Sequence, residues 1–539
     1  MKKWIALMLL ICVMMTGSAF AADLNAPGQL PISNERLHFT IGVPNLTTVE
    51  DWETNEQTLK LEKDLNVDLD FVLFPYDKNE RIQKLELMIM AGGDDLPDII
   101  MGDCGDLSNI VRYGEMGMIL PTTEYYKNDA YWTEDTCKEG GMSKEDLLRY
   151  VTCYDGEIYG VFQYNGSPNN CYSEARCMVY EPWLKQLGLE MPVTTDDFAN
   201  MLRAFRDQDP NGNGEADEIP LMSYNDYIDK NFIRFLMSPF IYTQENYFNW
   251  NEGKIEFVAN MDAWKKGLEW IHSLYEEGLI LPMSFTQDRS SYSAIISEEP
   301  TKVGAFAYFS ASILGANDAR RADYICVDPL LGPDGVRNGV YMPRIPAIRM
   351  MITKNCKEPE AAFRLGNYLC SQVMSLWTRY GEENVDWFHP EEGAHGVYEE
   401  SLGYGAFFTV VTPWGVLQNK WWGVDTPCII LDKWSAGQTK NESDIYNHTF
   451  PIGRSLKKTV EYQNPHPITG LVFNEEEQEV VTEYQSTINA YVLQSFSEFV
   501  TGIKSLDTDW DSYVAEFAHM GLDEYMAAVQ SCYDRMYSN

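Results

Sequence analysis

The chain has 539 residues, which at about 150 residues per domain is enough for two to four domains. Hydrophobic residues make up 45% of it and charged residues 23%, the usual mixture of a soluble globular protein. Asp and Glu number 81 against 41 Lys and Arg. The resulting net charge of -40 repels nucleic-acid phosphates and anionic lipid headgroups, so neither is expected as a partner.

Residues 1–21 have the pattern of a secretory signal peptide. Two lysines stand near the start, a mostly apolar stretch covers 4–15, and 19–21 offers a small-x-small cleavage pattern. The apolar stretch is shorter than the ~20 residues that a membrane-spanning helix needs. Ala22 follows the cleavage site in place of a cysteine, so a lipid anchor is not expected. We therefore predict an exported protein, at the extracellular face of the cytoplasmic membrane or in the periplasm.

Strands and helices alternate along the first part of the chain. Residues 37–43 predict a short strand, and 82–89 carry apolar residues on one helical face. A buried strand is expected at 98–101, and the pattern over 153–164 is again typical of strands, with a turn inside it. This alternation predicts α/β lobes.

The later part of the chain continues in the same way. Thr194, with Asp197 three residues later, has the signature of a capping box at the start of a helix. Its apolar face repeats at helical spacing through Phe198, Met201, Leu202 and Phe205. Pro359 begins another helix, and two amphipathic stripes separated by a glycine follow near the C-terminus.

Residues 207–218 have the pattern of a calcium-binding loop. Alternating oxygen-bearing side chains, with glycine for the sharp turn, supply the oxygen ligands that calcium requires. One register begins at Asp207 and ends at Glu218. A second register begins two residues later and uses Asp209, Asn211, Asn213, the Glu215 carbonyl, Asp217 and Glu218. The alternative is a polar turn. Because one loop without a partner is present, we expect a structural Ca2+ ion rather than a switch.

The sequence around this loop resembles a known family, the larger extracellular solute-binding proteins of bacterial carbohydrate ABC importers, which include alginate-binding members. The resemblance is carried by WLKQLGL at 183–189, PVT at 192–194, DPNGNG at 209–214, DEIPL at 217–221, LPDII at 96–100 and DGEIYG at 155–160. It extends over roughly residues 36–535. It implies two α/β lobes around a hinged sugar-binding cleft, as in periplasmic binding proteins, and calcium bound in the second register.

The same resemblance implies the layout and the function. It places 36–165 plus 303–343 in the first lobe and 175–295 plus 355–539 in a second, larger lobe. Crossings between the lobes are expected near 165–178, 295–303 and 343–355. The implied function is that of a monomeric substrate-binding component, which captures an oligosaccharide and passes it to the permease subunits of an ABC transporter.

Aromatic residues are the candidates for sugar contact, because a pyranose ring packs its C–H face on an aromatic ring. Trp414 follows a proline and precedes a glycine, and Trp421 and Trp422 are adjacent in a loop-like stretch. Adjacent side chains cannot both face one regular core, so at least one is expected to be exposed. Trp387 and Tyr164 complete the predicted set. The alternative role for each is packing within or between the lobes.

No catalytic motif stands out. The sequence contains no G-x-S-x-G, H-E-x-x-H, P-loop or G-x-G-x-x-G pattern. Adjacent carboxylates such as Glu382–Glu383 could serve a glycosidase, but in so acidic a chain they arise by chance. We therefore predict no enzyme and no catalytic residues. The alternative from another class is a secreted, calcium-containing carbohydrate-active enzyme.

Overall fold

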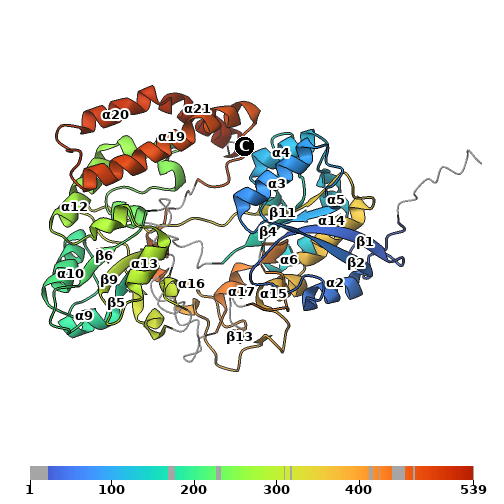
Figure 1. Cartoon of the computed structure of the whole chain (residues 1–539), viewed down its shortest axis with the longest axis horizontal. Coiled ribbons are helices and arrows are strands. Elements are labelled where there is room, and N and C mark those ends of the chain that lie inside the picture. The colour runs from blue at the N-terminus through green and yellow to red at the C-terminus, as the bar shows by residue number, and fades with distance from the viewer. Residues whose placement is uncertain are drawn as a thin grey trace, which may run out of the picture.

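The computed structural model describes residues 22–167, 176–225, 232–308, 310–315, 318–411, 417–423, 425–439, 456–464, 466 and 468–537. The predicted signal peptide and Trp414 lie outside these residues. Figure 1 shows two lobes, each built around its own sheet, so the predicted α/β class and two-lobe organisation are confirmed. In the described part of the chain, no helix combines the length and the apolar character that a membrane crossing requires.

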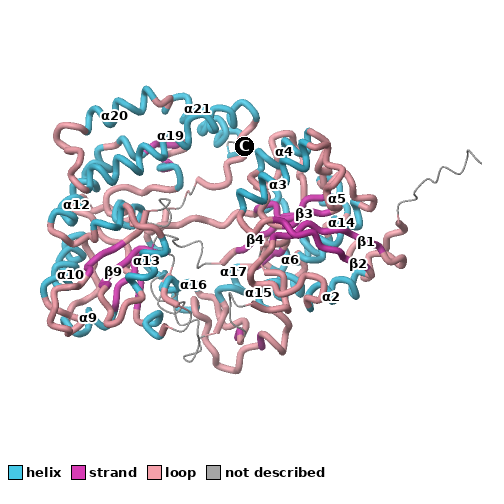
Figure 2. The backbone as a smooth tube through the Cα atoms, viewed as in Figure 1, coloured by secondary structure: helices cyan, strands magenta, loops and turns pink. Residues whose placement is uncertain are grey.

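The first lobe is built on a six-stranded sheet in the order β14-β4-β11-β3-β1-β2. Its strands are β1 (Leu37–Pro44), β2 (Val67–Phe74), β3 (Ile99–Met101), β4 (Val161–Asn165), β11 (Ala347–Ile352) and β14 (Cys428–Ile430). Only β11 is antiparallel to its neighbours. The strands of this sheet appear together in Figure 2, surrounded by helices.

Helices bury the faces of the first sheet because each presents an apolar stripe to it. They are α2 (Glu56–Leu65), α3 (Lys78–Met90), α4 (Leu107–Glu115), α5 (Thr123–Asn128), α6 (Tyr131–Glu139), α7 (Lys144–Leu148), α14 (Pro359–Leu369), α15 (Gln372–Tyr380) and α17 (Asp432–Ala436). In α3, Leu85 and Ile89 of the predicted face are buried. The hairpin of β12 (Trp387–Phe388) and β13 (Thr409–Val410) and the short α16 (Glu399–Leu402) extend from this lobe.

The second lobe has a four-stranded sheet in the order β10-β5-β9-β6. Its strands are β5 (Arg176–Tyr180), β6 (Ile219–Met222), β9 (Val303–Tyr308) and β10 (Tyr324–Cys326), with a separate hairpin of β7 (Phe248–Asn251) and β8 (Lys254–Phe257). Its helices are α9 (Glu181–Leu187), α10 (Thr195–Asp207), α11 (Ile233–Met237), α12 (Asp262–Glu276), α13 (Arg289–Ile296), α19 (Glu475–Val500), α20 (Trp510–His519) and α21 (Leu522–Tyr537).

Short 3-10 turns connect several of these elements: η1 (Glu245–Tyr247), η2 (Val258–Asn260), η3 (Pro282–Phe285), η4 (Ala311–Ile313) and η5 (Ala319–Ala322). The capping box predicted at the start of α10 is present, with Thr194 and Asp197 each accepting from the other's backbone N–H. The predicted apolar face of α10 is buried in the core of the second lobe.

The structure corrects the predicted division of the chain between the lobes. Residues 303–308 form β9, which pairs with β5 and β6 in the second sheet and not with any first-lobe strand. The strand is buried along its whole length, as a central strand covered on both faces must be. Conversely, α14, α15 and β14, which were expected in the second lobe, pack into the core of the first lobe. No crossing therefore occurs at 295–303.

The chain passes between the lobes at three places. It leaves the first sheet after β4 to enter β5, and it returns between β10 and β11. It leaves again after α17 and reaches α19, and residues 440–455 of this passage are outside the described part. Val397 and Tyr398, just before α16, belong to a buried cluster made mainly of second-lobe side chains. The region around α16 thus adds a further contact between the lobes.

Candidate functional site

In each lobe, one edge of the sheet lies at the passages of chain that join the two lobes. In the first lobe, β1, β3, β4 and β14 all end at the edge where the antiparallel β11 begins. In the second lobe, β6 and β9 end where β5 begins. Since the chain runs from the end of β4 to the beginning of β5, these two edges flank the crossing. Carboxyl ends of strands are where α/β sheets usually bind ligands.

A network of charged side chains lies beside the ends of β2 and β3. Asp425 is 3.2 Å from Arg349 Nε and 3.7 Å from Arg81 Nη2, and Asp103 is 3.5 Å from Arg349 Nη2 and 3.0 Å from Lys78 Nζ. Burial by itself raises the pKa of Asp103, but the cations Arg349 and Lys78 outweigh it and hold that pKa below its ordinary value. Burial raises the pKa of Asp425 in spite of its two arginine neighbours. Each carboxylate is compensated by cations of the chain itself.

A different arrangement is found at the ends of β4 and β14. The Tyr164 hydroxyl donates to Asp432 Oδ1 over 3.3 Å, and burial raises the pKa of Asp432 to about 6. A Cβ atom added to Gly166 would lie 1.7 Å from the same Oδ1 atom, so the carboxyl group occupies the space of a side chain at this position. The Gly166 N–H donates to the carbonyl of Ile430, which fixes the start of the crossing against β14.

The edge of the second lobe carries hydroxyl, amide and aromatic groups. Ser223 and Tyr224 follow β6 directly, and Tyr308 ends β9. The Arg289 guanidinium lies 5.6 Å from the centre of the Tyr308 ring. Gln287 donates to the carbonyl of Ser223, while the Ser223 Oγ atom is buried with no hydrogen-bond partner among the described residues. This edge therefore carries a buried hydroxyl, that of Ser223, whose hydrogen-bonding capacity the described residues do not use.

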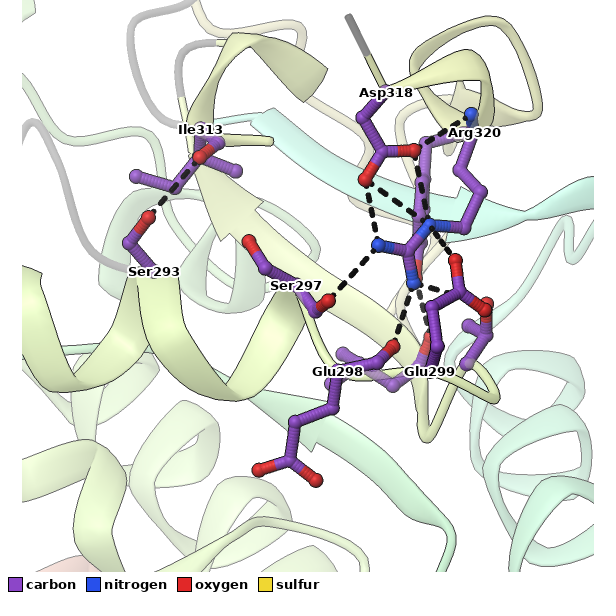
Figure 3. Close-up of polar contacts among 10 residues, drawn as sticks. Ser293, Ser297, Glu298, Glu299, Ile313, Asp318 and Arg320 are labelled. Carbon is purple, nitrogen blue, oxygen red and sulfur yellow. Dashed lines mark hydrogen bonds and ion pairs between the residues drawn. The ribbon is translucent and has the colours of Figure 1, made fainter. Parts of the chain in front are cut away.

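Arg320 fixes the end of α13, the helix whose first residue is Arg289 (Figure 3). It donates from Nη1 to the carbonyl of Glu298 over 2.7 Å and from Nη2 to that of Ser297 over 3.2 Å, at the end of α13. Its Nη2 atom is also 2.6 Å from Asp318, and this hydrogen bond holds the pKa of Asp318 below its ordinary value. Ser293 adds a hydrogen bond to a carbonyl oxygen of η4. These hydrogen bonds hold α13 in place beside the edge.

A cavity of about 560 Å³ lies between the lobes. The first lobe contributes the start of α4, and the second lobe contributes one side of α19 together with residues 468–473. Apart from Asp106, its lining is uncharged, with polar groups that include Ser108, Tyr154, Asn246, Thr469 and Gln485. Its volume lies within the usual range for small-molecule sites, which are commonly found between domains.

The predicted aromatic residues have different surroundings. Trp422 is 0% exposed, and its Nε1 atom donates to Thr58 Oγ1 over 2.8 Å. It packs in the first-lobe core, so its prediction as a ligand contact is corrected. Trp387 is 4% exposed and donates to the carbonyl of Gly381, which also makes it a packing residue in this structure. The argument that adjacent indoles cannot both be buried fails because residues 417–423 are irregular and fold against α2.

Tyr164 and Trp421 remain predictions as sugar contacts. Tyr164 is partly buried at the end of β4, on the edge that faces the crossing. Trp421 is 7% exposed, in the segment that packs against the loop after β1. The sequence did not single out Asp432. Its only signal was an aspartate directly after a short apolar strand, which is too common in this acidic chain to be distinctive.

The predicted calcium loop connects α10 to β6. Asp217 Oδ1 accepts hydrogen bonds from the amide groups of Asn211 and Asn213, each over 3.0 Å, and its Oδ2 atom is 3.2 Å from Lys302 Nζ. Asp209 accepts from the backbone N–H of Asn213. These contacts link Asp209, Asn211, Asn213 and Asp217 to one another and hold the loop closed.

Glu218 is the unusual member of this loop. Its Oε1 atom is buried without a hydrogen-bond partner in the described chain, and burial, followed by repulsion from neighbouring carboxylates, raises its pKa. Asp207 instead pairs with Arg206, which favours the second register, while Glu215 is exposed. Among the described residues, no three His, Cys, Asp or Glu side chains are close enough to hold a metal alone. A calcium ion in this loop would therefore need amide and backbone oxygens as further ligands.

No protein-family model matches the sequence. The fructooligosaccharide ABC transporter substrate-binding protein FusA of Streptococcus pneumoniae is 28% identical over 503 residues, which cover 90% of this chain and 88% of FusA. A crystallised EF-hand mutant of FusA, in complex with fructo-nystose, superposes with a TM-score of 0.73 at 23% identity, over 93% of this chain and all of that one.

A second solved structure has the same fold. The HMO-binding, ABC-transporter-associated solute-binding protein from Bifidobacterium longum infantis gives a TM-score of 0.76 at 19% identity. The match covers 94% of this chain and 100% of that chain. The two-lobe architecture is therefore shared along almost the whole length.

Proposed function

We propose that this chain, which belongs to the solute-binding proteins of ABC importers, captures an oligosaccharide between its two lobes. The observation that carries the proposal is the similarity to FusA along nine-tenths of the chain, together with the two strand-end edges at which the first crossing leaves one lobe and enters the other. As in other two-lobed binding proteins, closure of the lobes buries the ligand. The partners of the loaded protein are the permease subunits of the importer, reached after export from the cell.

The polar groups on both edges suit a sugar. Hydroxyl groups both donate and accept, so they can satisfy the Ser223 hydroxyl on one lobe and the Asp432 carboxyl on the other. An unpaired polar group inside the closed cleft costs about 1–3 kcal/mol, which gives the site its preference among hydroxyl arrangements. Aromatic faces at Tyr164, Trp421 and Trp414 are proposed to cover the apolar side of the sugar.

Titration calorimetry against an oligosaccharide panel tests this function. The panel should contain fructooligosaccharides, human milk oligosaccharides and oligogalacturonides. We expect saturable binding of one class and, by small-angle scattering, a smaller radius of gyration in the complex. Absence of binding to every class would contradict the proposal. Release of shorter products from a bound oligosaccharide would favour the alternative, a calcium-containing carbohydrate-active enzyme.

Trp421→Ala tests the aromatic contact. Loss of one stacking face is expected to weaken binding about tenfold, or ~1.4 kcal/mol. Tyr131→Ala is a suitable control, because Tyr131 is 47% exposed on α6. Both variants must retain the melting temperature of the unchanged protein to within a few degrees. Unchanged affinity in a folded Trp421→Ala protein would remove this residue from the site.

We further propose that the loop between α10 and β6 holds one structural Ca2+ ion. The ligands would be Asp209, Asn211, Asn213, the Glu215 carbonyl, Asp217 and Glu218. The buried, unpartnered Oε1 atom of Glu218 supports this proposal, because a bound cation would compensate it. An EF-hand has also been a target of mutation in FusA. Bound calcium would fix the start of β6, four residues before the ligand-facing edge.

A further inference from the structure

We propose that Asp432 and Tyr164 form a subsite that binds the hydroxyl groups of a neutral sugar unit and disfavours uronic acids. This inference rests on the proposed oligosaccharide function and specifies the class of ligand. It is carried by the contacts of one carboxyl group at the edge of the first lobe, where the chain begins its first crossing.

Asp432 has fewer partners than a carboxylate in its position normally has. Within the described residues its side chain accepts the 3.3 Å hydrogen bond from the Tyr164 hydroxyl and one from its own backbone N–H, and it is paired with no cation. For contrast, Asp386 in the same lobe is buried against Lys420 Nζ at 2.6 Å and the Glu382 N–H at 3.0 Å. A mostly buried carboxylate without a cation or several donors is costly, unless a ligand supplies the donors.

The Asp432 carboxyl lies directly over the backbone of Gly166. Gly166 has no side chain, and the carboxyl group extends over it beside the Tyr164 hydroxyl, which would be 3.0 Å from an added Cβ atom. Tyr164 and Gly166 are two residues apart, so they face the same side of β4 and its continuation. The two oxygen-bearing groups therefore lie together on one face.

The chemistry of these two groups selects the ligand. A carboxylate accepts from the hydroxyls of two neighbouring carbons of a sugar, and the phenol can donate or accept in turn. A uronic acid would bring a second negative charge to a position that has no neutralising cation among the described residues, and like charges in a poorly solvated site repel strongly. Asp432 thus excludes acidic sugars while it binds neutral ones.

Affinities for one neutral and one acidic ligand test this inference. Titration calorimetry with fructo-nystose and with trigalacturonate should give tighter binding of the neutral compound. Asp432→Asn should weaken neutral binding about tenfold and reduce the preference over trigalacturonate by a similar factor, because it removes the charged acceptor without changing its size. Tyr164→Phe should weaken neutral binding about threefold.

Asp94→Asn is the matched control, because Asp94 is almost fully exposed on the same lobe and its loss makes the same change in net charge. Asp432→Asn should fold normally, since burial disfavours the charge that it removes. If fructo-nystose binds the unchanged protein but Asp432→Asn leaves its affinity unaltered, the subsite is refuted and the oligosaccharide function stands. Tighter binding of trigalacturonate than of fructo-nystose refutes the proposed preference for neutral sugars. If no oligosaccharide binds, both proposals fail together.

Discussion

Two buried carboxyl groups near β14 differ in whether a cation of the chain lies beside them. Asp425 precedes the strand and Asp432 follows it, and burial raises the pKa of both. Asp425 is placed between Arg349 and Arg81, whereas Asp432 has the Tyr164 hydroxyl. Burial alone therefore does not distinguish a structural carboxylate from a ligand-binding one. The distinguishing property is whether the chain itself provides the opposite charge.

Replacing Arg349, a cation beside Asp425, should have the largest effect on the free energy of unfolding. Arg349→Met leaves two acidic side chains, Asp103 and Asp425, without their shared cation. Because Arg349 is only 17% exposed, we expect the free energy of unfolding to fall by about 3 kcal/mol. Urea titration followed by circular dichroism measures this change.

Arg36→Met provides the control for that experiment. Arg36 pairs with Asp68 over 2.9 Å, and both side chains are more than half exposed. Loss of such a pair should lower the free energy of unfolding by no more than about 0.5 kcal/mol. Equal losses in the two variants would show that the Asp425 network is as dispensable as a surface ion pair.

Glu218 adds a third case to this comparison, because a bound calcium ion, rather than a side chain, would neutralise its charge. A chelator should lower the melting temperature, because calcium at a hundredfold excess over its dissociation constant stabilises the folded state by about 2.7 kcal/mol. Glu218→Gln should abolish this dependence on chelator, and Glu190→Gln, at an exposed position, should preserve it. Metal analysis of the purified protein provides an independent measurement. If chelation changes nothing and no metal co-purifies, the loop is a polar turn.

The smallest expected effect is the pH dependence of stability that Asp432 causes. Its pKa is about 6 in the folded protein against an ordinary 3.8, so folding favours the protonated form. That contribution is fully present below pH 3.8 and is lost as the pH rises through 6. Tyr164 is the titratable group in contact with the carboxyl, and no charged group of the described residues touches it.

Asp432→Asn lacks this titration. We expect the free energy of unfolding of the unchanged protein to fall, relative to the variant, by about 1–2 kcal/mol between about pH 4 and pH 7.5. Urea titrations of both proteins at the two pH values measure the difference. If the free energies of unfolding of the two proteins differ by the same amount at both pH values, Asp432 is solvated like an ordinary surface carboxylate.

Local patterns in the sequence predicted local structure well. The Thr194 capping box, the apolar face of α10 and the α/β class follow from residue spacing and are present in the structure. In the predicted calcium loop, Asn211 and Asn213 both donate to Asp217, and metal binding there stays a prediction.

Long-range placement could not be obtained in the same way. The segment 303–308 is clearly a buried strand from its composition, but composition does not say which sheet it joins. Trp422 was expected near a ligand because its loop is irregular, yet the same irregularity allows it to turn into the core. Asp432 becomes distinctive only through the partners that it lacks, which no single-sequence pattern reports.

The first sheet is assembled from segments that are far apart in the chain, and this has a consequence for the order of folding. Tyr164 on β4 meets Asp432, directly after β14, across 268 residues, and the whole second sheet lies between them in the sequence. Contacts of such separation form slowly, because a long loop must close before they stabilise anything. The second sheet, complete by residue 326, can form while the first still lacks β11 and β14. Of the two sheets, the one that begins the sequence is therefore expected to be the later one to form, whereas the second lobe still waits for α19, α20 and α21 to complete its core.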